Sequence, residues 1–382
     1  MNKSAFTSND ISQMRTALTI AQRGLGEVYP NPTVGCVLVR EDLNNLIVGR
    51  GWTQVGGRPH AEAEAIRKAG TMAHDSTAYV TLEPCSHYGE TSPCTDALIK
   101  AGIKKVFLSV KDPDRRVSGT GIKRLKEAGI EVYVGLLKQE ALQINKGFFS
   151  LVTKKRPMIT WKIASSADGK IATKNGDSKW VTNGLSRKQG HLLRAEHDII
   201  LTSINTALED DPELTCRLPG LMHRSPQPIV LDSQLRLPPT SKLMNGMLKP
   251  WIYTNCQAPR ERQLKLEELG AKIFKIKRGA SKELSLNQII LHLSDIGITR
   301  VLLECGGTLA KSFLQKGLID QIYWYRSPII IGSDGLAAVN TLNISTIKNS
   351  LLFSHRNTYN FGSDTLSIFD KKEIIGRKCS QA

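Results

Sequence analysis

The sequence predicts an α/β protein of two domains, and three observations support this. The chain has 382 residues, a length that points to two domains, each able to bury its own core. Runs with strand patterning alternate with stretches of helical periodicity, which is typical of layered α/β domains. The basic run Lys154-Lys155-Arg156 ends in a proline and interrupts this alternation. We therefore place the domains at residues 1–153 and 154–382.

In the first half, Asp10 can cap a helix whose apolar residues follow helical spacing, and Tyr-Pro-Asn-Pro at residues 29–32 breaks it. His60 opens a second helix, through residue 69, and Pro93-Cys94 opens a third, through residue 101, since proline suits a first helical turn. The remaining predicted elements are strands at residues 33–39, 46–51, 78–82, 105–110 and 130–135 and helices at residues 122–128 and 139–153.

The second half restarts with a strand and a polar loop. Its predicted strands are residues 158–164, 198–202, 228–231, 251–254, 271–276, 300–303 and 320–326, and its predicted helices are residues 184–195, 260–269, 286–296 and 309–315. Two shorter β-like stretches near Leu351 and Leu366 close the chain. The strand at 300–303 runs into Gly306-Gly307, where backbone N–H groups can approach a phosphate at a helix start, although most such glycines only shape turns.

The densest chemistry of the chain lies between His60 and Cys94. His60, Cys85 and Cys94 can supply three zinc ligands and leave a fourth tetrahedral position for water, as catalytic zinc sites do. Glu62 follows the histidine by two residues and can exchange protons with that water without ligating. His-x-Glu followed by Pro-Cys-x-x-Cys is typical of zinc base deaminases. Here eight residues separate the cysteines, so the residue types match and the spacing matches in part.

Each of these residues also has a structural interpretation. A lone His-x-Glu is usually a helix face, and two cysteines are more often buried small side chains than ligands. Both cysteines, however, follow a proline and lie in polar sequence, which favours zinc. Arg194 and Arg217 can each clamp a phosphate in forked geometry, but each taken alone is better read as a surface arginine.

The composition predicts a soluble, cytoplasmic protein. Hydrophobic residues make up 40% of the chain and the mean hydropathy is −0.22. The first ten residues are polar, and no run of about 18 apolar residues appears, so neither a signal peptide nor a membrane span is expected. Seven cysteines without a disulfide-like spacing fit a reducing compartment.

The net charge of +17 indicates anionic partners, which are nucleic acid or phosphorylated small molecules. The basic residues form no long block, and few aromatic residues lie among them, which weakens a platform for stacked bases. We therefore expect phosphorylated small molecules as partners, no nucleic acid and no membrane. We also expect a homo-oligomer.

Taken together, the motifs resemble the bifunctional riboflavin-biosynthesis deaminase/reductase family. The deaminase half is matched by His60-Ala61-Glu62, by residues 81–87 (Thr-Leu-Glu-Pro-Cys-Ser-His) and by Pro93-Cys94, with Asp112-Pro113 and Gly119-Thr120-Gly121 extending the match. The reductase half is matched by Lys162-Ile163-Ala164, Asp168-Gly169-Lys170, Ser178-Lys179-Trp180, Asp210-Asp211-Pro212, Leu214-Thr215, Arg217 and Glu304 with Gly306-Gly307. The match covers roughly residues 8 to 370, in the family's order.

The resemblance implies a three-layer, cytidine-deaminase-like domain followed by a dihydrofolate-reductase-like α/β domain. It also implies two reactions. The first is zinc-dependent hydrolytic deamination of 2,5-diamino-6-ribosylamino-4(3H)-pyrimidinone 5′-phosphate. The second is NADPH-dependent reduction of the ribosyl group of 5-amino-6-(5-phosphoribosylamino)uracil to ribityl. The implied cofactors are one zinc ion per chain and NADPH, and the positive charge fits these phosphorylated ligands.

The resemblance also implies roles for individual residues. In the deaminase, His60, Cys85 and Cys94 hold zinc and Glu62 is catalytic, while Asn31 contacts the substrate. The implied substrate contacts of the reductase are Lys162, Ser178, Arg194, Leu214, Arg217 and Glu304. The implied cofactor contacts are Ala164, Trp180, Thr206, Asp210, Ser233, Gly306, Gly307, Thr308 and Leu309.

Two positions depart from the family pattern. Thr53 stands where the family usually has histidine, and Glu90 stands where it usually has lysine or arginine. Both changes bear on the affinity of the deaminase for its substrate and leave the zinc ligands untouched.

Two other interpretations compete with the bifunctional enzyme. One is a nucleic-acid base deaminase with a basic accessory domain. The other is a non-catalytic protein with structural zinc, for which His87 is the nearest candidate fourth ligand.

Overall fold

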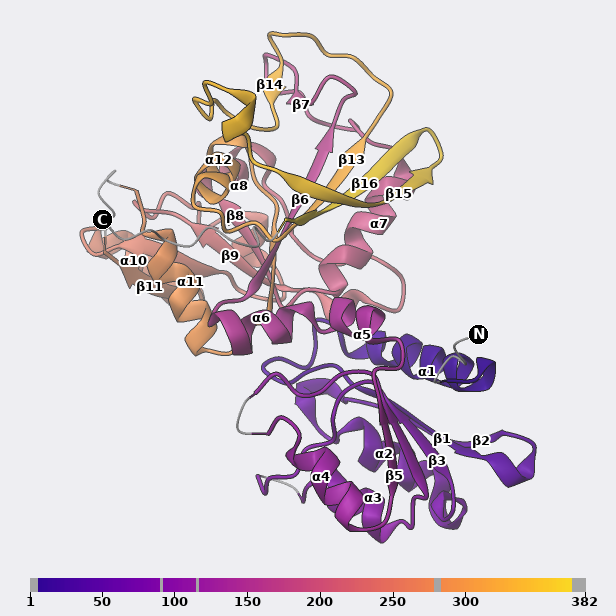
Figure 1. Cartoon of the computed structure of the whole chain (residues 1–382). Helices are drawn as coiled ribbons and strands as arrows, with labels where there is room; N and C mark the ends of the chain where they lie inside the picture. Colours follow the sequence, from indigo (N-terminus) through magenta and orange to yellow (C-terminus); the bar gives the residue numbers. More distant parts are fainter. Residues whose placement is uncertain (1–5, 90–91, 115–116, 278–282, 373–382) are drawn as a thin grey trace, which may run out of the picture. The chain divides into compact units, whose positions relative to one another are not determined.

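The computed structural model describes residues 6–89, 92–114, 117–277 and 283–372. Its contacts divide the chain into two compact units (Figure 1). The first contains residues 1–157 with 293–299, and the second contains residues 158–292 with 300–382. The boundary predicted after residue 153 falls in the last turn of helix α6 (Lys146–Lys154), just before this division, and as a domain assignment it stays a prediction.

The first unit contains a mixed sheet of five strands in the order β2-β1-β3-β4-β5. Strand β1 is antiparallel to both of its neighbours, while β3, β4 and β5 run parallel. The strands are β1 (Gly35–Arg40), β2 (Leu46–Trp52), β3 (Thr77–Val80), β4 (Lys105–Leu108) and β5 (Glu131–Val134). The helices before α6 are α1 (Ser8–Ala21), α2 (Ala61–Ala69), α3 (Cys94–Lys100), α4 (Thr120–Glu127) and α5 (Lys138–Ile144).

Glycines let helices pack closely on both faces of this sheet. A Cβ at Gly35 would lie 1.9 Å from the Ala17 carbonyl oxygen of α1, and one at Gly51 would lie 2.1 Å from the Ala61 carbonyl oxygen of α2. Gly51 pairs with Cys36, the residue after Gly35, so the two glycines face opposite sides of the sheet. Helices α1 and α2 therefore cover opposite faces, which confirms the predicted three-layer arrangement (Figure 1).

Two predicted helices of the first unit need correction. The first is capped by Thr7, not Asp10; Asp10 is its third residue and completes a capping box with Thr7. The helix predicted at residues 139–153 is two helices, α5 and α6, which meet at Asn145. Asn145 is 4% exposed, and its side-chain amide forms two hydrogen bonds with the backbone of Thr33. It accepts from the Thr33 N–H at 2.9 Å and donates to the Thr33 carbonyl at 2.8 Å.

The second unit contains a sheet of nine strands in the order β11-β10-β9-β8-β12-β6-β13-β16-β15. The first seven strands in this order, from β11 at the edge through β13, run parallel. The β15–β16 hairpin then adds two antiparallel strands. The strands are β6 (Met158–Ser165), β8 (Ile199–Ser203), β9 (Gln227–Leu231), β10 (Trp251–Asn255), β11 (Lys272–Ile276), β12 (Arg300–Leu303), β13 (Gln321–Arg326), β15 (Phe353–Phe361) and β16 (Asp364–Lys371). A small separate sheet pairs β7 (Lys170–Ala172) with β14 (Leu336–Ala337).

The second half contains six α-helices in the described residues, four of which the sequence patterns predicted. The helices are α7 (Gly184–Ala195), α8 (Ile204–Asp210), α9 (Lys242–Asn245), α10 (Arg260–Glu268), α11 (Leu286–Asp295) and α12 (Gly307–Gln315). Helices α8 and α9 and strands β7 and β14 were not predicted, because each is short and lacks a sustained period. Short 3₁₀ helices lie at Gln22–Gly24, Glu41–Leu43, Val55–Gly57, Gly70–Ala73, Met222–Arg224 and Ile347–Asn349. None of the helices in the described ranges is long and apolar enough to cross a membrane.

We predict that Asn145→Ala destabilises the protein by about 2–4 kcal/mol, because the buried N–H and C=O groups of Thr33 lose their partners together. Urea denaturation of the full chain measures the change. The control is Asn9→Ala, which removes an exposed amide contact with Asn45 and should cost little. Equal stability of the two variants would contradict the proposed importance of the Asn145 amide.

Candidate active sites

The structure brings the three predicted zinc ligands together in the first unit. The ligand atoms of His60, Cys85 and Cys94 all lie within 4.8 Å of one another. Nδ1 of His60 lies 3.3 Å from the sulfur of Cys94 and 3.7 Å from that of Cys85. Zinc–sulfur bonds of about 2.3 Å and zinc–nitrogen bonds of about 2.0–2.1 Å give tetrahedral edges of about 3.5–3.8 Å. The donor atoms therefore match the size of a zinc site in spacing and in chemistry.

Local structure explains why the ligands meet. His60 is the N-terminal cap of α2, and Pro93 is the N-terminal cap of α3, which places Cys94 in the first turn. The Cys94 N–H donates to the sulfur of Cys85 at 3.3 Å, so the start of α3 faces this sulfur. The Cys94 side chain and the His60 imidazole lower the pKa of Cys85 to about 4. The thiolate form needed for a zinc ligand is thus favoured.

Glu62 stands beside these ligands in the first turn of α2 and is 3% exposed. Burial, followed by the negative charge of Cys85, raises the pKa of Glu62 to about 7. A carboxyl group with a pKa near neutral pH can both accept and return a proton. His87, by contrast, is exposed and lies outside the ligand cluster, so the described residues offer no fourth ligand there for structural zinc.

Glu83, a second buried carboxylate of the zinc motif, binds backbone N–H groups and not the ligand cluster. Glu83 is 3% exposed and accepts hydrogen bonds from the backbone N–H groups of Asp112, Gly119 and Ile122 at 3.0–3.2 Å. It thereby fixes the start of α4 to the segment that carries Cys85. The sequence resemblance contains Glu83, but only the structure identifies this clamping role.

The other deaminase positions lie in the same unit. The Asn31 side chain packs against Gly57, three residues before His60, so closely that a Cβ at Gly57 would lie 2.0 Å from Nδ2. Thr53 is 2% exposed, and its hydroxyl donates to the Pro32 carbonyl and accepts from the Val34 N–H. The Thr53 hydroxyl hydrogen is therefore committed to the fold. Glu90 lies outside the described residues.

The second unit contains two cavities at the carboxyl ends of its parallel strands. They have volumes of about 640 and 360 Å³ and share Ile171, Thr206, Glu209, Gly306 and Leu336. Strand order reverses around β6, β12 and β8, and open α/β sheets bind ligands beside such a point. The cavities are thus where the fold predicts a binding site.

Most of the predicted reductase residues line these cavities. The larger cavity contains Lys162, Ala164, Ser178, Trp180, Arg194, Thr206, Asp210, Leu214, Glu304 and Gly306. The smaller cavity contains Thr206, Ser233, Gly306, Gly307, Thr308 and Leu309. Arg217 lines neither and instead forms an exposed ion pair with Glu213 at 2.9 Å. The roles assigned to these residues stay predictions.

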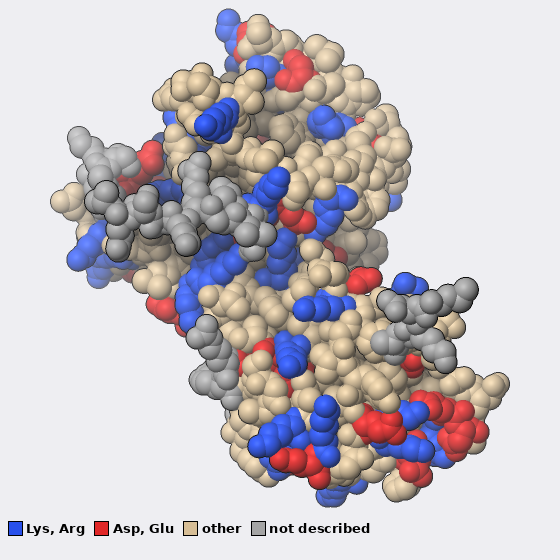
Figure 2. Space-filling view, viewed as in Figure 1, with Lys and Arg blue, Asp and Glu red and all other residues tan. Residues whose placement is uncertain are grey.

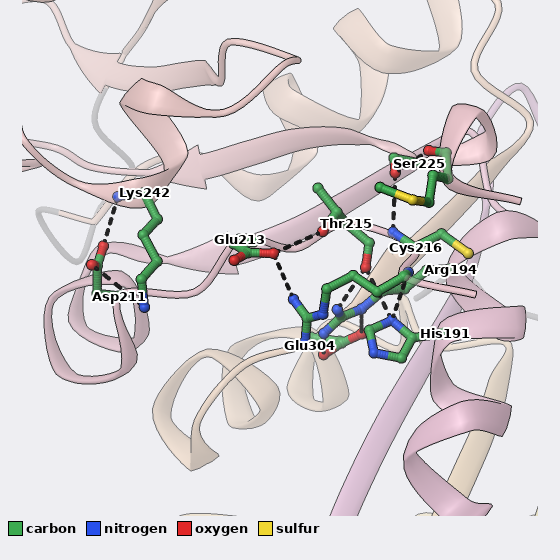
Figure 3. A network of polar contacts seen from close by, with 11 residues as sticks. His191, Arg194, Asp211, Glu213, Thr215, Cys216, Ser225, Lys242 and Glu304 are labelled. Atoms are coloured by element: carbon green, nitrogen blue, oxygen red, sulfur yellow. Dashed lines mark hydrogen bonds and ion pairs between the residues drawn. The ribbon is translucent and has the colours of Figure 1, made fainter. Parts of the chain in front are cut away.

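The polar centre of the larger cavity is the ion pair between Arg194 of α7 and Glu304 after β12 (Figure 3). Arg194 donates from Nε and Nη2 to the two carboxylate oxygens at 2.8 and 2.9 Å, and from Nη1 to the Thr215 carbonyl at 3.0 Å. Burial alone would raise the pKa of Glu304, but Arg194 and Lys162 outweigh it and lower the pKa to about 2. Arg194 therefore holds Glu304 ionised, and each of its guanidinium nitrogens is already engaged.

Lys162 and Trp180 are two further predicted residues that line the larger cavity. Burial lowers the pKa of Lys162, although the charge of Glu304 opposes this shift. Trp180 is 72% exposed, has a left-handed backbone (φ +68°), and stacks against the Arg187 guanidinium at 4.1 Å. Trp180 thus marks the mouth of the cavity.

Several lining residues were not predicted. They include Glu209 on α8, Lys174, Asn175 and Gly176 after β7, and Leu336, Ala337, Ala338 and Asn340 around β14. Helix α8 has a detectable signal, because the Ser203 hydroxyl caps it by accepting from the Thr206 N–H. The segment around β14 has none, since only its fold places it beside Gly306-Gly307.

The surface charge does not form one basic track on the face that Figure 2 shows. Lys and Arg side chains are spread over both units, and Asp and Glu side chains lie among them. The positive net charge therefore does not by itself outline a nucleic-acid groove on this face.

Two family models match the chain, in agreement with the division of chemistry between the units. Residues 7–110 match the cytidine and deoxycytidylate deaminase zinc-binding region, and residues 157–367 match the RibD C-terminal domain. The curated riboflavin biosynthesis protein RibD of Aquifex aeolicus is 39% identical over 362 residues, covering 95% of this chain and 98% of that protein. RibD of Escherichia coli is 38% identical, covering 92% of this chain and 96% of that protein.

Solved structures also resemble this chain over nearly its whole length. RibD of Acinetobacter baumannii superimposes with a TM-score of 0.85 at 34% identity, covering 96% of this chain and 99% of that one. A Thermotoga maritima protein described as a diaminohydroxyphosphoribosylaminopyrimidine deaminase/5-amino-6-(5-phosphoribosylamino)uracil reductase superimposes with a TM-score of 0.82 at 32% identity, covering 95% of this chain and 99% of that one.

We predict that Arg194→Met destabilises the protein by about 3 kcal/mol at pH 7, because it leaves Glu304 buried without its cation. The folded pKa of Glu304 is lowered from 4.5 to about 2, so the stability from this pair is complete above about pH 4.5 and is lost as the pH falls toward 2. The difference between variant and wild type should therefore shrink below pH 4.5 in urea titrations at several pH values.

The control for this experiment is Arg217→Met, which breaks an ion pair whose partners are 50% and 48% exposed. Exposed pairs contribute little, so we expect a change of less than about 1 kcal/mol at every pH. A pH-independent loss in Arg194→Met would contradict the assignment of the effect to the Glu304 charge.

Proposed function

The chain belongs to the RibD family and is a bifunctional deaminase/reductase of riboflavin biosynthesis; from this we propose its substrates, cofactors and the roles of its residues. The first unit deaminates 2,5-diamino-6-ribosylamino-4(3H)-pyrimidinone 5′-phosphate. The second reduces the ribosyl group of 5-amino-6-(5-phosphoribosylamino)uracil to ribityl with NADPH. The observation that carries the deaminase is the cluster of His60, Cys85 and Cys94 with buried Glu62 beside it.

In the deaminase, His60, Cys85 and Cys94 would hold one zinc ion. Zinc at such a site lowers the pKa of a bound water to about 7 and supplies a nucleophile near neutral pH. Glu62 accepts a proton from the attacking water and returns it to the leaving amine, so that the amino group departs as ammonia and oxygen takes its place. Its pKa near 7 suits both halves of this transfer.

Deaminase substrate recognition involves the segment before the zinc ligands. Asn31 offers an amide that can donate to and accept from a pyrimidine edge, and the absence of a side chain at Gly57 leaves room for it. Thr53 supports the backbone on either side of Thr33 and so acts through the fold.

In the reductase, the smaller cavity would hold part of NADPH. Gly306 caps α12, and the first N–H groups of a helix have no intrahelical acceptor, which suits a phosphate. NADPH supplies a hydride. Lys162 and Glu304 line the larger cavity, where their charged groups can contact the sugar hydroxyls, and Arg194 fixes Glu304.

A cytoplasmic location and a homo-oligomeric assembly remain expectations from the sequence. The free cysteines in the described residues suit a reducing compartment. Size-exclusion chromatography with light scattering would determine the assembly.

The two activities can be tested separately on one preparation. Ammonia release from the diaminopyrimidine ribotide reports the deaminase, and oxidation of NADPH in the presence of the deaminated product reports the reductase. Failure of either reaction with a metal-loaded, folded chain would contradict the corresponding half of the proposal.

We predict that Glu62→Gln lowers the deamination rate about 10²–10⁴-fold, because the amide cannot accept and return a proton. Zinc content, measured by atomic absorption, and NADPH-dependent reduction should be unchanged. The matched control is Glu64→Gln on the same helix, where Glu64 pairs with Arg67 and Lys68. Loss of zinc in Glu62→Gln, or deamination at the wild-type rate, would contradict the proposed role of Glu62 in proton transfer.

A further inference from the structure

Residues 329–340, here called the strap, form a wall shared by both cavities of the second unit. Leu336 lines both cavities, Ala338 lines the larger one, and Ala337 and Asn340 line the smaller one. The strap contains no regular structure beyond the two residues of β14. The position of this wall therefore depends on how the strap is attached to the rest of the unit.

Asp168 attaches the first end of the strap. One oxygen of its carboxylate accepts from the Gly332 N–H at 2.8 Å, and the other accepts from the Ile331 N–H at 3.2 Å. The Ser166 hydroxyl donates to this second oxygen at 2.5 Å and fixes the carboxylate in place. The Ser166 hydroxyl and the Gly332 N–H lower the pKa of Asp168 to about 2, so the acceptor is ionised at any working pH.

Asn340 attaches the other end, directly on the turn that starts α12. Its side chain donates to the Thr308 hydroxyl at 2.9 Å, and its backbone N–H donates to the Gly307 carbonyl at 3.4 Å. A Cβ at Gly307 would lie 2.8 Å from both the Ala337 carbonyl oxygen and Oδ1 of Asn340. The strap and the Gly306-Gly307 turn thus meet without intervening space.

Burial contributes little to holding the strap between these ends. Ile329, Ile330 and Leu336 are 43%, 71% and 44% exposed, although Ala338 is buried. Strand β14 pairs with β7 at two positions, Leu336 with Ala172 and Ala337 with Lys170. Three further hydrogen bonds join the strap to residues 167–170: the Ala167 N–H donates to the Ile329 carbonyl, the Ala338 N–H donates to the Gly169 carbonyl, and Lys170 Nζ donates to the Ser333 carbonyl. Because apolar burial is small, the polar attachments determine how often the strap is in place, and Asp168 supplies two of them.

We propose that Asp168 is a positioning residue of the reductase: it holds the strap against the Gly306-Gly307 turn and thereby sets the affinity for NADPH. Asp168 lines neither cavity and acts through Leu336, Ala337 and Asn340. If the strap leaves its place for a fraction of the time, the apparent affinity for a ligand of the smaller cavity falls by that fraction. The proposal rests on the reductase function proposed above.

The test compares Asp168→Ala with wild type in the full-length chain. Losing one or two hydrogen bonds on the strap should raise the KM and the dissociation constant for NADPH about five- to tenfold, with kcat nearly unchanged. NADPH binding is measured without turnover by its fluorescence. Asp168→Asn keeps one acceptor oxygen and should lie between Ala and wild type. Deaminase activity of the same preparations should not change.

Two further variants make the experiment decisive. Asn340→Ala releases the other end of the strap and should weaken NADPH binding in the same way. Asp334→Asn removes an exposed carboxylate from the middle of the strap. In the described residues the strap's middle is bonded to the rest of the unit through the Ser333 carbonyl, which accepts from Lys170, and not through the Asp334 side chain, so this variant should leave NADPH binding at the wild-type value.

The outcomes separate the two proposals. Wild-type NADPH affinity in both Asp168→Ala and Asn340→Ala overturns the positioning role, as does an equal loss in Asp334→Asn. A loss confined to kcat also overturns it. If the wild-type chain itself binds no NADPH, the proposed reductase function fails instead.

Discussion

Keeping a carboxylate buried is the physical constraint on which both active sites depend. An ionised carboxylate out of water is costly unless hydrogen bonds or an opposite charge compensate it. Three glutamates in or beside the two sites are largely shielded from water, and each is compensated differently. Glu83 receives three backbone N–H groups and holds a loop, Glu304 receives a bidentate arginine and stays ionised, and Glu62 lacks such a cation. Burial raises the pKa of Glu62 to about 7, whereas at Glu304 the charges of Arg194 and Lys162 together outweigh burial and lower the pKa to about 2. The same side chain thereby serves as a clamp at Glu83, as a fixed charge at Glu304 and, in the proposed mechanism, as a proton carrier at Glu62.

Both units also place helix N-termini at their candidate sites. In the first unit, His60 and Pro93 cap α2 and α3, so that two zinc ligands and Glu62 are gathered at two helix N-termini. In the second unit, Gly306 caps α12 beside the smaller cavity. Negative charge is favoured at these ends, whether it is a thiolate, a carboxylate or a phosphate. The two units thus use one electrostatic feature for different chemistry.

The sequence predicted the parts of these sites that lie close together along the chain. The strands and helices with a sustained period were placed to within a few residues, and the three residues predicted to bind zinc from residue type and spacing do lie together. Taken alone, Arg194 and Arg217 were both interpreted as surface arginines, because sequence cannot supply the contacts that distinguish them. Arg194 meets Glu304, 110 positions away, and Arg217 turns to Glu213 on the surface. The kink at Asn145 was missed for the same reason, since its partner Thr33 lies 112 positions away. Elements such as α8 and β14 were missed because two to seven residues carry no detectable period.

Each active site draws its residues from one unit. The zinc ligands, Glu62, Asn31 and Glu83 all lie before residue 157, whereas every residue lining the two cavities lies after it. The residues that we assign to the two sites therefore come from different units, so the surroundings of Glu62 and Glu304 can change independently. Covalent linkage then adds a fixed one-to-one ratio of the two catalysts. The first reaction must finish before the second has its substrate, and a fixed ratio prevents either catalyst from being made without the other. Joining the two catalysts in one chain therefore coordinates their supply.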